Sequence, residues 1–329
     1  MKRHPAGRLS EGDFEIVETP RPEFGQGQVL VRNIYLSLDP YMRPMMDPVR
    51  SYIPHLNPGD IMAGTTVGVV VQSNVEALSN GTFVTGRLGW QTYATATPSA
   101  LRVVDPAIAP ISTALGILGM PGVTAHYGLL ALAQPNASET IVVSAASGAV
   151  GSVVGQIAKL KGCRVVGIAG GQQKCNFAVN ELNFDACIDH RSPTLQQDFE
   201  TATPDFVDVS FENVGGTLMS MVLNRLNAHA RITLCGFISG YDGAQANAVP
   251  PLEQLIKQRA TMRGFIASEH LGYWPGAIAE LATWLREGRL KYRESVSEGI
   301  ESAPAAFIGM LNGRNFGKQI VRLGPETGT

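Results

Sequence analysis

Residues 140–162, TIVVSAASGAVGSVVGQIAKLKG, predict a buried strand, a tight turn and a helix in immediate succession. The Val- and Ile-rich run 140–145 is typical of a parallel strand that is covered on both faces. Apolar residues at helical spacing follow between Gly148 and Lys161, and Gly162 suits the left-handed position that ends a helix. This order aims backbone N–H groups and the positive end of a helix at one point, where an anion binds. The stretch therefore predicts the pyrophosphate site of a dinucleotide-binding unit.

The turn departs from the G-x-G-x-x-G pattern of such units, because Ala146 stands at the position of the first glycine. We expect Gly148 to let a phosphate approach the backbone closely, and Gly151 to let the helix pack closely on the strand. Ala149 and Val150 fill the positions between them. A glycine pattern alone is a weak signal, so an ordinary strand-to-helix turn stays open as the alternative. The flanking strand and helix favour the dinucleotide site.

The composition argues against several classes of function. Of the 329 residues 44% are hydrophobic and 16% are charged, and the formal net charge is −2, as in a globular chain with a large core. No basic stripe indicates a nucleic-acid partner or an anionic membrane surface. Gly, Pro and His interrupt the apolar stretch 111–133, and no apolar run follows the basic N-terminus. We therefore expect no membrane span and no secretion signal, but a cytoplasmic protein.

Metal and serine-hydrolase chemistry are not expected. The six histidines are scattered without an H-E-x-x-H pattern, and no two cysteines form a C-x-x-C pair. No G-x-S-x-G pattern marks a nucleophilic serine. We expect the cysteines to be buried apolar residues in a reducing compartment. They are Cys163, Cys175, Cys187 and Cys235.

The pattern of the chain changes near residue 120. Residues 1–119 carry short strand-like runs separated by Gly, Pro and Asn, which predicts an antiparallel, barrel-like domain. Residues 120–289 alternate strand and helix patterns, which predicts a doubly wound parallel sheet and an α/β fold. The expected strands are 140–145, 163–169, 186–189, 206–211, 231–235 and 261–266, and the expected helices are 123–133, 148–161, 172–182, 216–226 and 274–289.

The end of the second expected strand of this sheet bears on the choice of cofactor. NAD-binding units normally place Asp or Glu there to bond the adenosine ribose, whereas residues 168–174 are IAGGQQK, without a carboxylate. Lys174 and, after the next short strand, His190 and Arg191 supply cationic groups. Such groups suit a 2′-phosphate, which a carboxylate would repel. We therefore expect NADPH (NADP) rather than NADH; the alternative is that Lys174 is a solvated lysine at a helix start.

Motifs spread over the chain resemble those of the zinc-independent medium-chain dehydrogenase/reductases, and within them the prostaglandin reductase and alkenal/alkenone double-bond reductase group. They are SLDPYMR (37–43), GMPGVTA (119–125), AASGAVGSVVGQIAKLK (145–161), ENVGG (212–216), CGFISGY (235–241), GFI (264–266) and NFGKQIV (315–321). The resemblance covers nearly the whole chain. It implies a GroES-like antiparallel β-barrel catalytic domain (1–119 and 290–329) and a Rossmann NADPH-binding domain (120–289). It also implies a homodimer that reduces the C=C bond of small-molecule α,β-unsaturated ketones or aldehydes by hydride transfer to the β-carbon, without metal.

The resemblance further implies which positions line the cofactor. These are Met120 and Thr124 near the nicotinamide; Ala146, Gly148, Ala149, Val150 and Gly151 at the pyrophosphate; Gly170, Lys174, His190 and Arg191 at the 2′-phosphate; and Asn213, Cys235, Ser239, Tyr241, Phe265, Ile266 and Asn315 along the remainder. One departure concerns the 2′-phosphate, where the family often has Tyr-Lys and this chain has His190-Arg191. The charge is kept at Arg191, and the part played by His190 stays open.

The expected chemistry needs a hydrogen-bond donor at the substrate carbonyl, because negative charge develops on that oxygen as a hydride adds. Tyr241 is the candidate, since a tyrosine hydroxyl donates without carrying charge. Water or Tyr241 supplies the proton at the α-carbon. Tyr52, in the loop 48–58, is a second candidate hydroxyl. The competing interpretations are that Tyr241 only packs, and that Asn315 is a turn residue and not a ligand of the nicotinamide carboxamide.

Two other functions stay open at this point. A zinc-free NADPH:quinone oxidoreductase of the same superfamily would share the fold and the cofactor but would reduce a different acceptor. A non-catalytic NADPH-binding or structural protein would bind the cofactor and turn over no acceptor.

Overall fold

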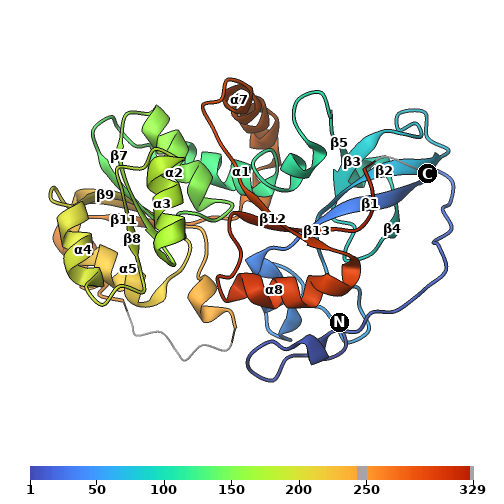
Figure 1. Ribbon diagram of the computed structural model, residues 1–329, viewed down its shortest axis with the longest axis horizontal. Helices are drawn as coiled ribbons and strands as arrows, with labels where there is room; N and C mark the ends of the chain where they lie inside the picture. Colours follow the sequence, from blue (N-terminus) through green and yellow to red (C-terminus); the bar gives the residue numbers. More distant parts are fainter. Residues whose placement is uncertain (243–249, 327–329) are drawn as a thin grey trace. The chain divides into compact units, whose positions relative to one another are not determined.

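The structure is a computed structural model that describes residues 1–242 and 250–326 (Figure 1). These residues form two compact units. The first unit contains Met1–Gly116 together with residues 241–242 and 294–326, and the second contains Ile117–Gly240 together with residues 250–293. None of the helices within the described ranges combines the length and the apolar character that crossing a membrane requires.

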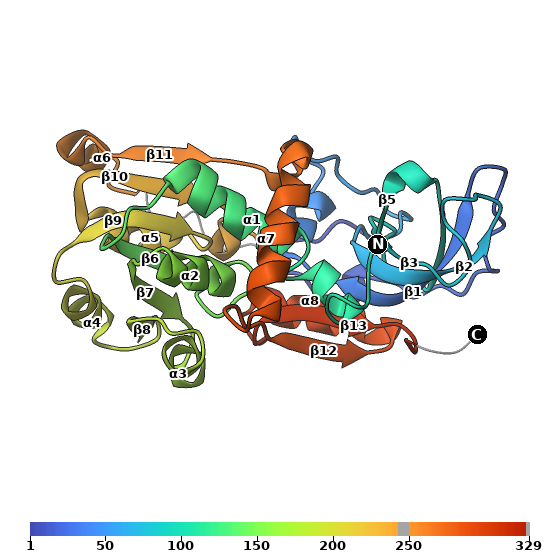
Figure 2. The same cartoon turned by 90° about the horizontal axis from the view of Figure 1, so that it is seen from above.

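The second unit is built on a six-stranded sheet in which every strand pair is parallel. Its strand order is β11-β10-β9-β6-β7-β8, with β11 and β8 at the two edges (Figure 2). The strands are β6 (Thr140–Ser144), β7 (Arg164–Ala169), β8 (Ala186–Asp189), β9 (Val207–Glu212), β10 (Leu226–Leu234) and β11 (Thr261–Gly264). The expectation of a doubly wound, Rossmann-type parallel sheet is confirmed.

Helices precede, connect and follow these strands. They are α1 (Met120–His126), the π-helix η6 (Tyr127–Ala133), α2 (Gly151–Leu160), α3 (Gln172–Asn180), α4 (Leu195–Ala202), α5 (Gly216–Leu223), α6 (Glu253–Gln258), α7 (Trp274–Arg286) and the 3-10 turns η7 (Ile238–Gly240), η8 (Ala267–Glu269) and η9 (Leu271–Tyr273). The expected helix 148–161 begins later, at Gly151, because the turn before it extends further. The expected helix 123–133 begins earlier, at Met120, because Pro121 suits the first turn of a helix.

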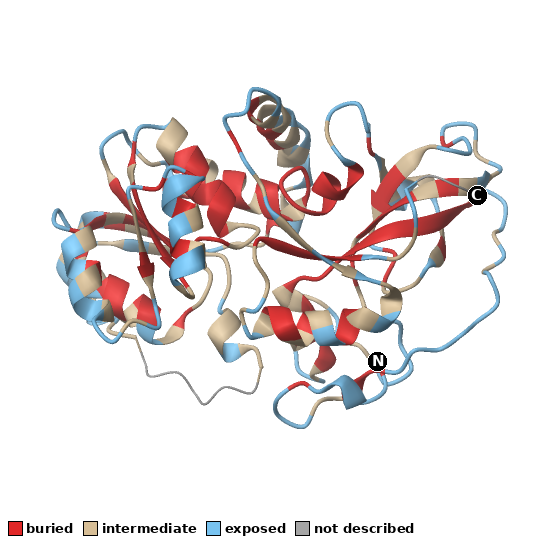
Figure 3. Cartoon of the chain, viewed as in Figure 1, coloured by how far each residue is buried: buried red, intermediate tan, exposed pale blue. Residues whose placement is uncertain are grey.

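The central strands β6, β7 and β9 are buried on both faces, as Figure 3 shows for the centre of the unit. Val142, Val166 and Ile232 of the sheet pack in one cluster with Phe199 of α4 and Leu223 of α5. Full burial of each such side chain contributes about 1.5–3 kcal/mol. This packing explains why β6 (TIVVS) and β7 (RVVGIA) are mainly runs of apolar residues.

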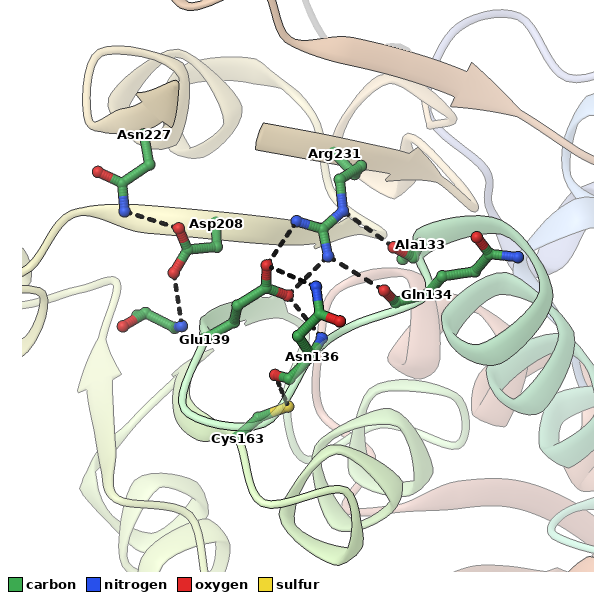
Figure 4. Close-up of polar contacts among 9 residues, drawn as sticks. Ala133, Gln134, Asn136, Glu139, Cys163, Asp208, Asn227 and Arg231 are labelled. Carbon is green, nitrogen blue, oxygen red and sulfur yellow. Dashed lines mark hydrogen bonds and ion pairs between the residues drawn. The ribbon is translucent and has the colours of Figure 1, made fainter. Parts of the chain in front are cut away.

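A polar network closes the amino-terminal edge of the same sheet (Figure 4). Arg231 of β10 donates two hydrogen bonds to the carboxylate of Glu139, at 2.9 and 2.6 Å, and a third to the carbonyl of Ala133 at the end of η6. Burial alone would raise the pKa of Glu139, but the hydrogen bonds from Arg231 and Asn136 outweigh it and hold that pKa below its ordinary value. The network therefore ties η6 to the start of β6.

The first unit contains a seven-stranded sheet with the path β12-β13-β1-β2-β3-β5, and β4 also pairs with β1. All pairs are antiparallel except β12 with β13. Its elements are β1 (Val29–Ser37), β2 (Thr66–Ser73), β3 (Phe83–Gly86), β4 (Tyr93–Ala96), β5 (Leu101–Val103), β12 (Glu294–Glu298), β13 (Lys318–Arg322), α8 (Ala303–Leu311) and the 3-10 turns η1 (Glu11–Asp13), η2 (Pro40–Met42), η3 (Pro44–Met46), η4 (Pro98–Ala100), η5 (Ile111–Leu115) and η10 (Ile300–Ser302). The expected antiparallel sheet is confirmed, and its closure into a barrel stays a prediction.

A buried lysine joins two distant motifs within this unit. Lys318 of β13 is 4% exposed, and its ammonium group donates to the carbonyl of Leu38 at 2.6 Å and to a carboxylate oxygen of Asp39 at 3.0 Å. Asp39 also accepts a hydrogen bond from the hydroxyl of Ser37. The motif SLDPYMR is therefore fixed to the motif NFGKQIV by a desolvated ion pair.

We expect Lys318→Met to lower the free energy of unfolding by about 3–5 kcal/mol, because the variant leaves the carboxylate of Asp39 buried without its counter-charge. Urea unfolding followed by tryptophan fluorescence measures the change. Lys291→Met is the matched control, since it removes an exposed ion pair between Lys291 and Glu181 and should have a much smaller effect. Equal losses in the two variants would contradict the importance of the buried pair.

Candidate functional site

The loops that follow the parallel strands gather at the carboxyl edge of the six-stranded sheet. The winding reverses between β6 and β9, which are neighbours although β7 and β8 lie between them in sequence. Ligands of doubly wound sheets bind outside the carboxyl ends of the strands at this switch point. The cofactor-lining positions expected in this unit lie in these loops, in the first turns of α2 and α3, or on α1.

The turn after β6 is shaped by two close approaches. A Cβ at Gly151 would lie 2.4 Å from the carbonyl oxygen of Ala145, so only glycine fits there. A Cβ at Gly148 would lie 3.1 Å from the same oxygen, which is tight but tolerable. Ala146 is buried and packs beside Gly167 of β7. A Cβ at Gly167 would lie 2.7 Å from the Cβ of Ala146. The missing first glycine of the pattern is therefore accommodated by a glycine on the neighbouring strand.

The same turn has the properties of a phosphate site. Gly148, Ala149 and Val150 are half-buried, so the turn is open to a ligand. It leads directly into the N-terminus of α2, where backbone N–H groups and the helix dipole favour an anion. The geometry fits the pyrophosphate that the sequence predicts.

The side chains of His190 and Arg191, from the loop after β8, reach over Gly170, which follows β7. A Cβ at Gly170 would lie 2.8 Å from the Nε2 atom of His190 and 3.4 Å from a guanidinium nitrogen of Arg191. Burial and then the charge of Arg191 lower the pKa of Lys174, and the same two causes lower the pKa of His190. Positive charge is thus concentrated at one place, and a bound dianion such as a 2′-phosphate would relieve the repulsion.

Asp189, at the end of β8, is a residue that the sequence reasoning missed. Its carboxylate accepts hydrogen bonds from the backbone N–H groups of Gly171, at 2.8 Å, and Arg191, at 3.0 Å. Burial would raise the pKa of Asp189, but these two hydrogen bonds outweigh it and lower the pKa. Asp189 therefore orders both loops that carry the cations. The available signal was an acidic residue placed directly at the end of a short strand.

Glu212, at the end of β9, was also missed. The side chain is 1% exposed, and its Oε1 atom accepts hydrogen bonds from the hydroxyl of Ser144 and from the N–H groups of Val214 and Gly215, at 2.7–2.8 Å. Burial raises the pKa of Glu212. The side chain of Asn213 donates to the carbonyl of Ser144 at 2.7 Å. The expected cofactor residue Asn213 thus also ties the end of β9 to the end of β6.

The loop after β10 is joined to the loop after β9. The N–H of Cys235 donates to the carbonyl of Glu212 at 2.9 Å, and both the N–H and the hydroxyl of Ser239 donate to the carbonyl of Val214. Burial, and secondarily the charge of Glu212, raises the pKa of Cys235 to about 12, so its thiol stays protonated. Cys235 and Ser239 lie where the sequence predicts, with their described hydrogen bonds directed to the backbone.

The remaining expected residues of this unit lie on two further segments. Met120 and Thr124 are half-buried on α1, and Phe265 and Ile266 directly follow β11. The ring of Phe265 packs edge-on against Phe211 of β9, with ring centroids 6.4 Å apart. The structure thus holds the segment after β11 against the middle of the sheet.

Tyr241, Tyr52 and Asn315 belong to the first unit. Tyr241 is half-buried, and its neighbour Asp242 accepts hydrogen bonds from the N–H of Leu9 at 2.7 Å and from the buried guanidinium of Arg43 at 3.3 Å. Tyr52 is exposed, and the side chain of Asn315 donates to the carbonyl of Gly317 at 2.8 Å, as a turn residue does. Over residues 1–242 and 250–326, no group of three or more His, Cys, Asp or Glu side chains is arranged to hold a metal ion.

Comparison with known proteins gives a consistent result. A family model described as the N-terminal domain of oxidoreductase matches residues 1–104, and one described as zinc-binding dehydrogenase matches residues 149–283. The chain is 43% identical to the NADPH-dependent curcumin reductase of Escherichia coli over 96% of this chain and 91% of that protein. It is 40% identical to prostaglandin reductase 1 of Rattus norvegicus over 98% and 97% of the two chains. The crystal structure of CurA from Vibrio vulnificus in complex with NADPH is similar, with a TM-score of 0.94, 41% identity and 98% of each chain covered.

Proposed function

This chain belongs to the zinc-independent medium-chain dehydrogenase/reductases, in the group of prostaglandin and alkenal/alkenone reductases, and from that membership we propose that it reduces the C=C bond of α,β-unsaturated ketones and aldehydes with NADPH. One observation of the structure carries the proposal: Lys174, His190 and Arg191 form a cationic group at the end of β7 and β8. The fold that contains this cationic group is shared, over nearly the whole chain, with CurA, whose crystal structure contains NADPH.

The two units have separate tasks in this proposal. Residues 120–289 form the NADPH-binding domain, and residues 1–119 with 290–329 form the catalytic domain. The division into compact units supports this, although the units change at residues 117 and 294, a few positions from the expected boundaries.

In this proposal each part of NADPH has its own set of residues. The turn Gly148–Gly151 and the start of α2 would hold the pyrophosphate, with Ala146 beneath it. Lys174 and Arg191 would pair with the 2′-phosphate, with His190 and Gly170 beside them. The nicotinamide half would be lined by Met120, Thr124, Asn213, Cys235, Ser239, Tyr241, Phe265, Ile266 and Asn315. When bound, NADPH supplies a hydride, which is the reductant that the C=C bond requires.

Tyr241 is the proposed hydrogen-bond donor in the reaction. Addition of a hydride to the β-carbon of an enone leaves negative charge on the carbonyl oxygen, and a donor aimed at that oxygen stabilises the transition state more than the ground state. The hydrogen bonds of Asp242 to Leu9 and Arg43 support this role, because they hold the backbone next to Tyr241. Tyr52 is the second hydroxyl candidate for contact with the substrate.

An acceptor screen tests the function. We expect NADPH consumption with 2-alkenals and alkenones, with a kcat/KM for NADPH about tenfold or more above that for NADH, because an ion pair with the 2′-phosphate contributes at least about 1.4 kcal/mol. Turnover of quinones but not of enones would instead show a quinone oxidoreductase. NADPH binding without turnover of any acceptor would show a non-catalytic protein.

Charge variants serve as the control for this experiment. Lys174→Ala and Arg191→Ala should lower kcat/KM for NADPH and leave that for NADH unchanged, because only NADPH carries the phosphate. Equal losses with both cofactors would contradict the placement of the 2′-phosphate.

We expect Tyr241→Phe to lower kcat by about tenfold or more, with little change in the affinity for NADPH, because it removes one donor from the developing oxyanion. Stopped-flow measurement of NADPH oxidation gives both quantities. Tyr93→Phe is a matched control, since it removes a hydroxyl that accepts a hydrogen bond from Arg21, far along the chain from these residues. An unchanged kcat in Tyr241→Phe would assign this residue to packing.

We also propose a homodimer in the cytoplasm. Among the described strands β11 has a single neighbour, β10, so its other edge is available for pairing. The apolar side chains of Ile256 and Leu271 flank this strand in sequence and are 81% and 66% exposed, as at an interface. The cysteines are free, with Cys163 and Cys175 buried as expected but Cys187 and Cys235 partly exposed, and free thiols suit a reducing compartment.

Light scattering tests the dimer. The wild-type chain should have about twice the 35.1 kDa mass of one chain, and the double variant Ile256→Glu with Leu271→Glu should shift toward the monomer, because buried unpaired carboxylates are costly. Ile16→Glu, at an exposed apolar residue of the first unit, is the control. A double variant with the wild-type mass would place the interface elsewhere, and a monomeric wild type would refute the dimer.

A further inference from the structure

A buried histidine with two polar partners lies at the end of α1. His126 is 5% exposed, its Nδ1 atom is 2.7 Å from the hydroxyl oxygen of Tyr273, and its Nε2 atom is 2.7 Å from a carboxylate oxygen of Glu280. Its ring also stacks on Trp284, with centroids 5.9 Å apart. We call these four residues the His126 cluster. It joins α1 to η9 and to α7.

The two hydrogen bonds of His126 have complementary directions. A carboxylate only accepts, so the Nε2–H of the imidazole donates to Glu280. In the neutral ring Nδ1 then accepts, and the hydroxyl of Tyr273 donates to it. Burial, then the charge of Glu280, raises the pKa of Tyr273, which keeps that hydroxyl protonated. Both nitrogen atoms are thus engaged, and the ring cannot rotate without losing two part-buried hydrogen bonds.

Aromatic contacts continue from the cluster to the segment after β11. The ring of Tyr273 packs edge-on against Tyr127, with centroids 5.0 Å apart. Tyr127 in turn stacks on His270 at 4.3 Å and contacts Phe265 at 5.7 Å. A Cβ at Gly128 would lie 2.8 Å from the ring of Phe265, so this packing leaves no space at that position. The contacts therefore run without interruption from α1 to Phe265.

The cluster connects two segments that the proposed function places at one end of the cofactor. Met120 and Thr124 lie on α1, whereas Phe265 and Ile266 follow β11, about 140 residues later in the chain. Apolar packing alone would leave the rotation of α1 less well defined than two directional hydrogen bonds do. A misplacement of about 1 Å is enough to slow a hydride transfer considerably.

We propose that His126 is a positioning residue, which fixes α1 against the segment 265–273 and thereby sets the nicotinamide half of the site. The inference rests on the proposed NADPH function. The inference assigns no such role at the adenosine half, where Lys174 lies on α3 and Arg191 follows β8.

Two ligands separate the halves of the site in the test. NADPH occupies both halves, whereas adenosine 2′,5′-bisphosphate carries the adenosine and the 2′-phosphate and has no nicotinamide. In Tyr273→Phe and His126→Phe, which keep the ring packing, the Kd for NADPH should rise about threefold to tenfold and kcat should fall, while the Kd for the bisphosphate stays within about twofold. Calorimetry gives both Kd values, and NADPH oxidation with an enone gives kcat.

Conservative variants sharpen the test. Glu280→Gln keeps an acceptor for the Nε2–H of His126 and should lose less NADPH affinity than Glu280→Leu. Tyr93→Phe, outside the cluster, should change neither Kd. Where His126→Phe does not fold, Tyr273→Phe decides, since it removes a single oxygen atom.

Two results would overturn the inference. Unchanged NADPH affinity and kcat in Tyr273→Phe and His126→Phe would show that the cluster does not act on the site. Equal weakening of both ligands would show a general structural role. A wild-type chain that binds neither ligand would refute the proposed function itself, and this outcome differs from the other two because it needs no variant.

Discussion

The carboxylate of Glu212 holds together the two strand ends between which the winding of the parallel sheet reverses. It is buried, and burial of a charge is costly unless donors surround it. The hydroxyl of Ser144 and two backbone N–H groups of the loop after β9 supply those donors. The loop after β10 is bonded to the same region through the carbonyl of Glu212. The glycine turn that begins beyond Ser144 therefore starts from a fixed point.

The same arrangement recurs at the edge of the sheet formed by β7 and β8. The carboxylate of Asp189 accepts hydrogen bonds from the backbone N–H groups of Gly171 and Arg191, and these donors stabilise its negative charge. The side chains of His190, Arg191 and Lys174 then set the local potential, and burial, followed by the charge of Arg191, lowers the pKa of Lys174. An acid at this edge thus does not by itself indicate NAD, since what matters is whether the carboxylate is already bonded to the protein.

Much of the second unit could be predicted from the sequence because its signals are local. Val/Ile runs located the strands of the parallel sheet, and the spacing of Gly148 and Gly151 located the turn. Lys174 and Arg191 were found because residues 168–174, at the end of the second strand, carry no carboxylate, whereas Lys174 and Arg191 are cationic. Two helices were missed: α4 (LQQDFETA) carries few apolar residues, and α8 (APAAFIGML) is apolar around most of its circumference. Periodicity detects only helices that are apolar on one side.

The site residues that the sequence did not reveal were missed for a different reason. Glu212, Asp189 and His126 act through partners on other elements, and a single residue type at a strand or helix end does not reveal which partner it meets. His126 illustrates this, because a lone histidine in an apolar helix is usually interpreted as packing. Only the positions of Tyr273 and Glu280, about 150 residues later, show that both of its nitrogen atoms are bonded.

The first unit shows how a residue can belong to one fold unit while its sequence neighbours belong to another. Gly240 lies in the second unit, yet Tyr241 and Asp242 lie in the first. The buried guanidinium of Arg43 accounts for this, since it bonds Asp242, Asp47 and the carbonyl of Gly7 at once. A cation with that many bonds is expensive to release, because each acceptor would be left without its donor. The chain next to Tyr241 is thus held by Arg43 of the motif SLDPYMR.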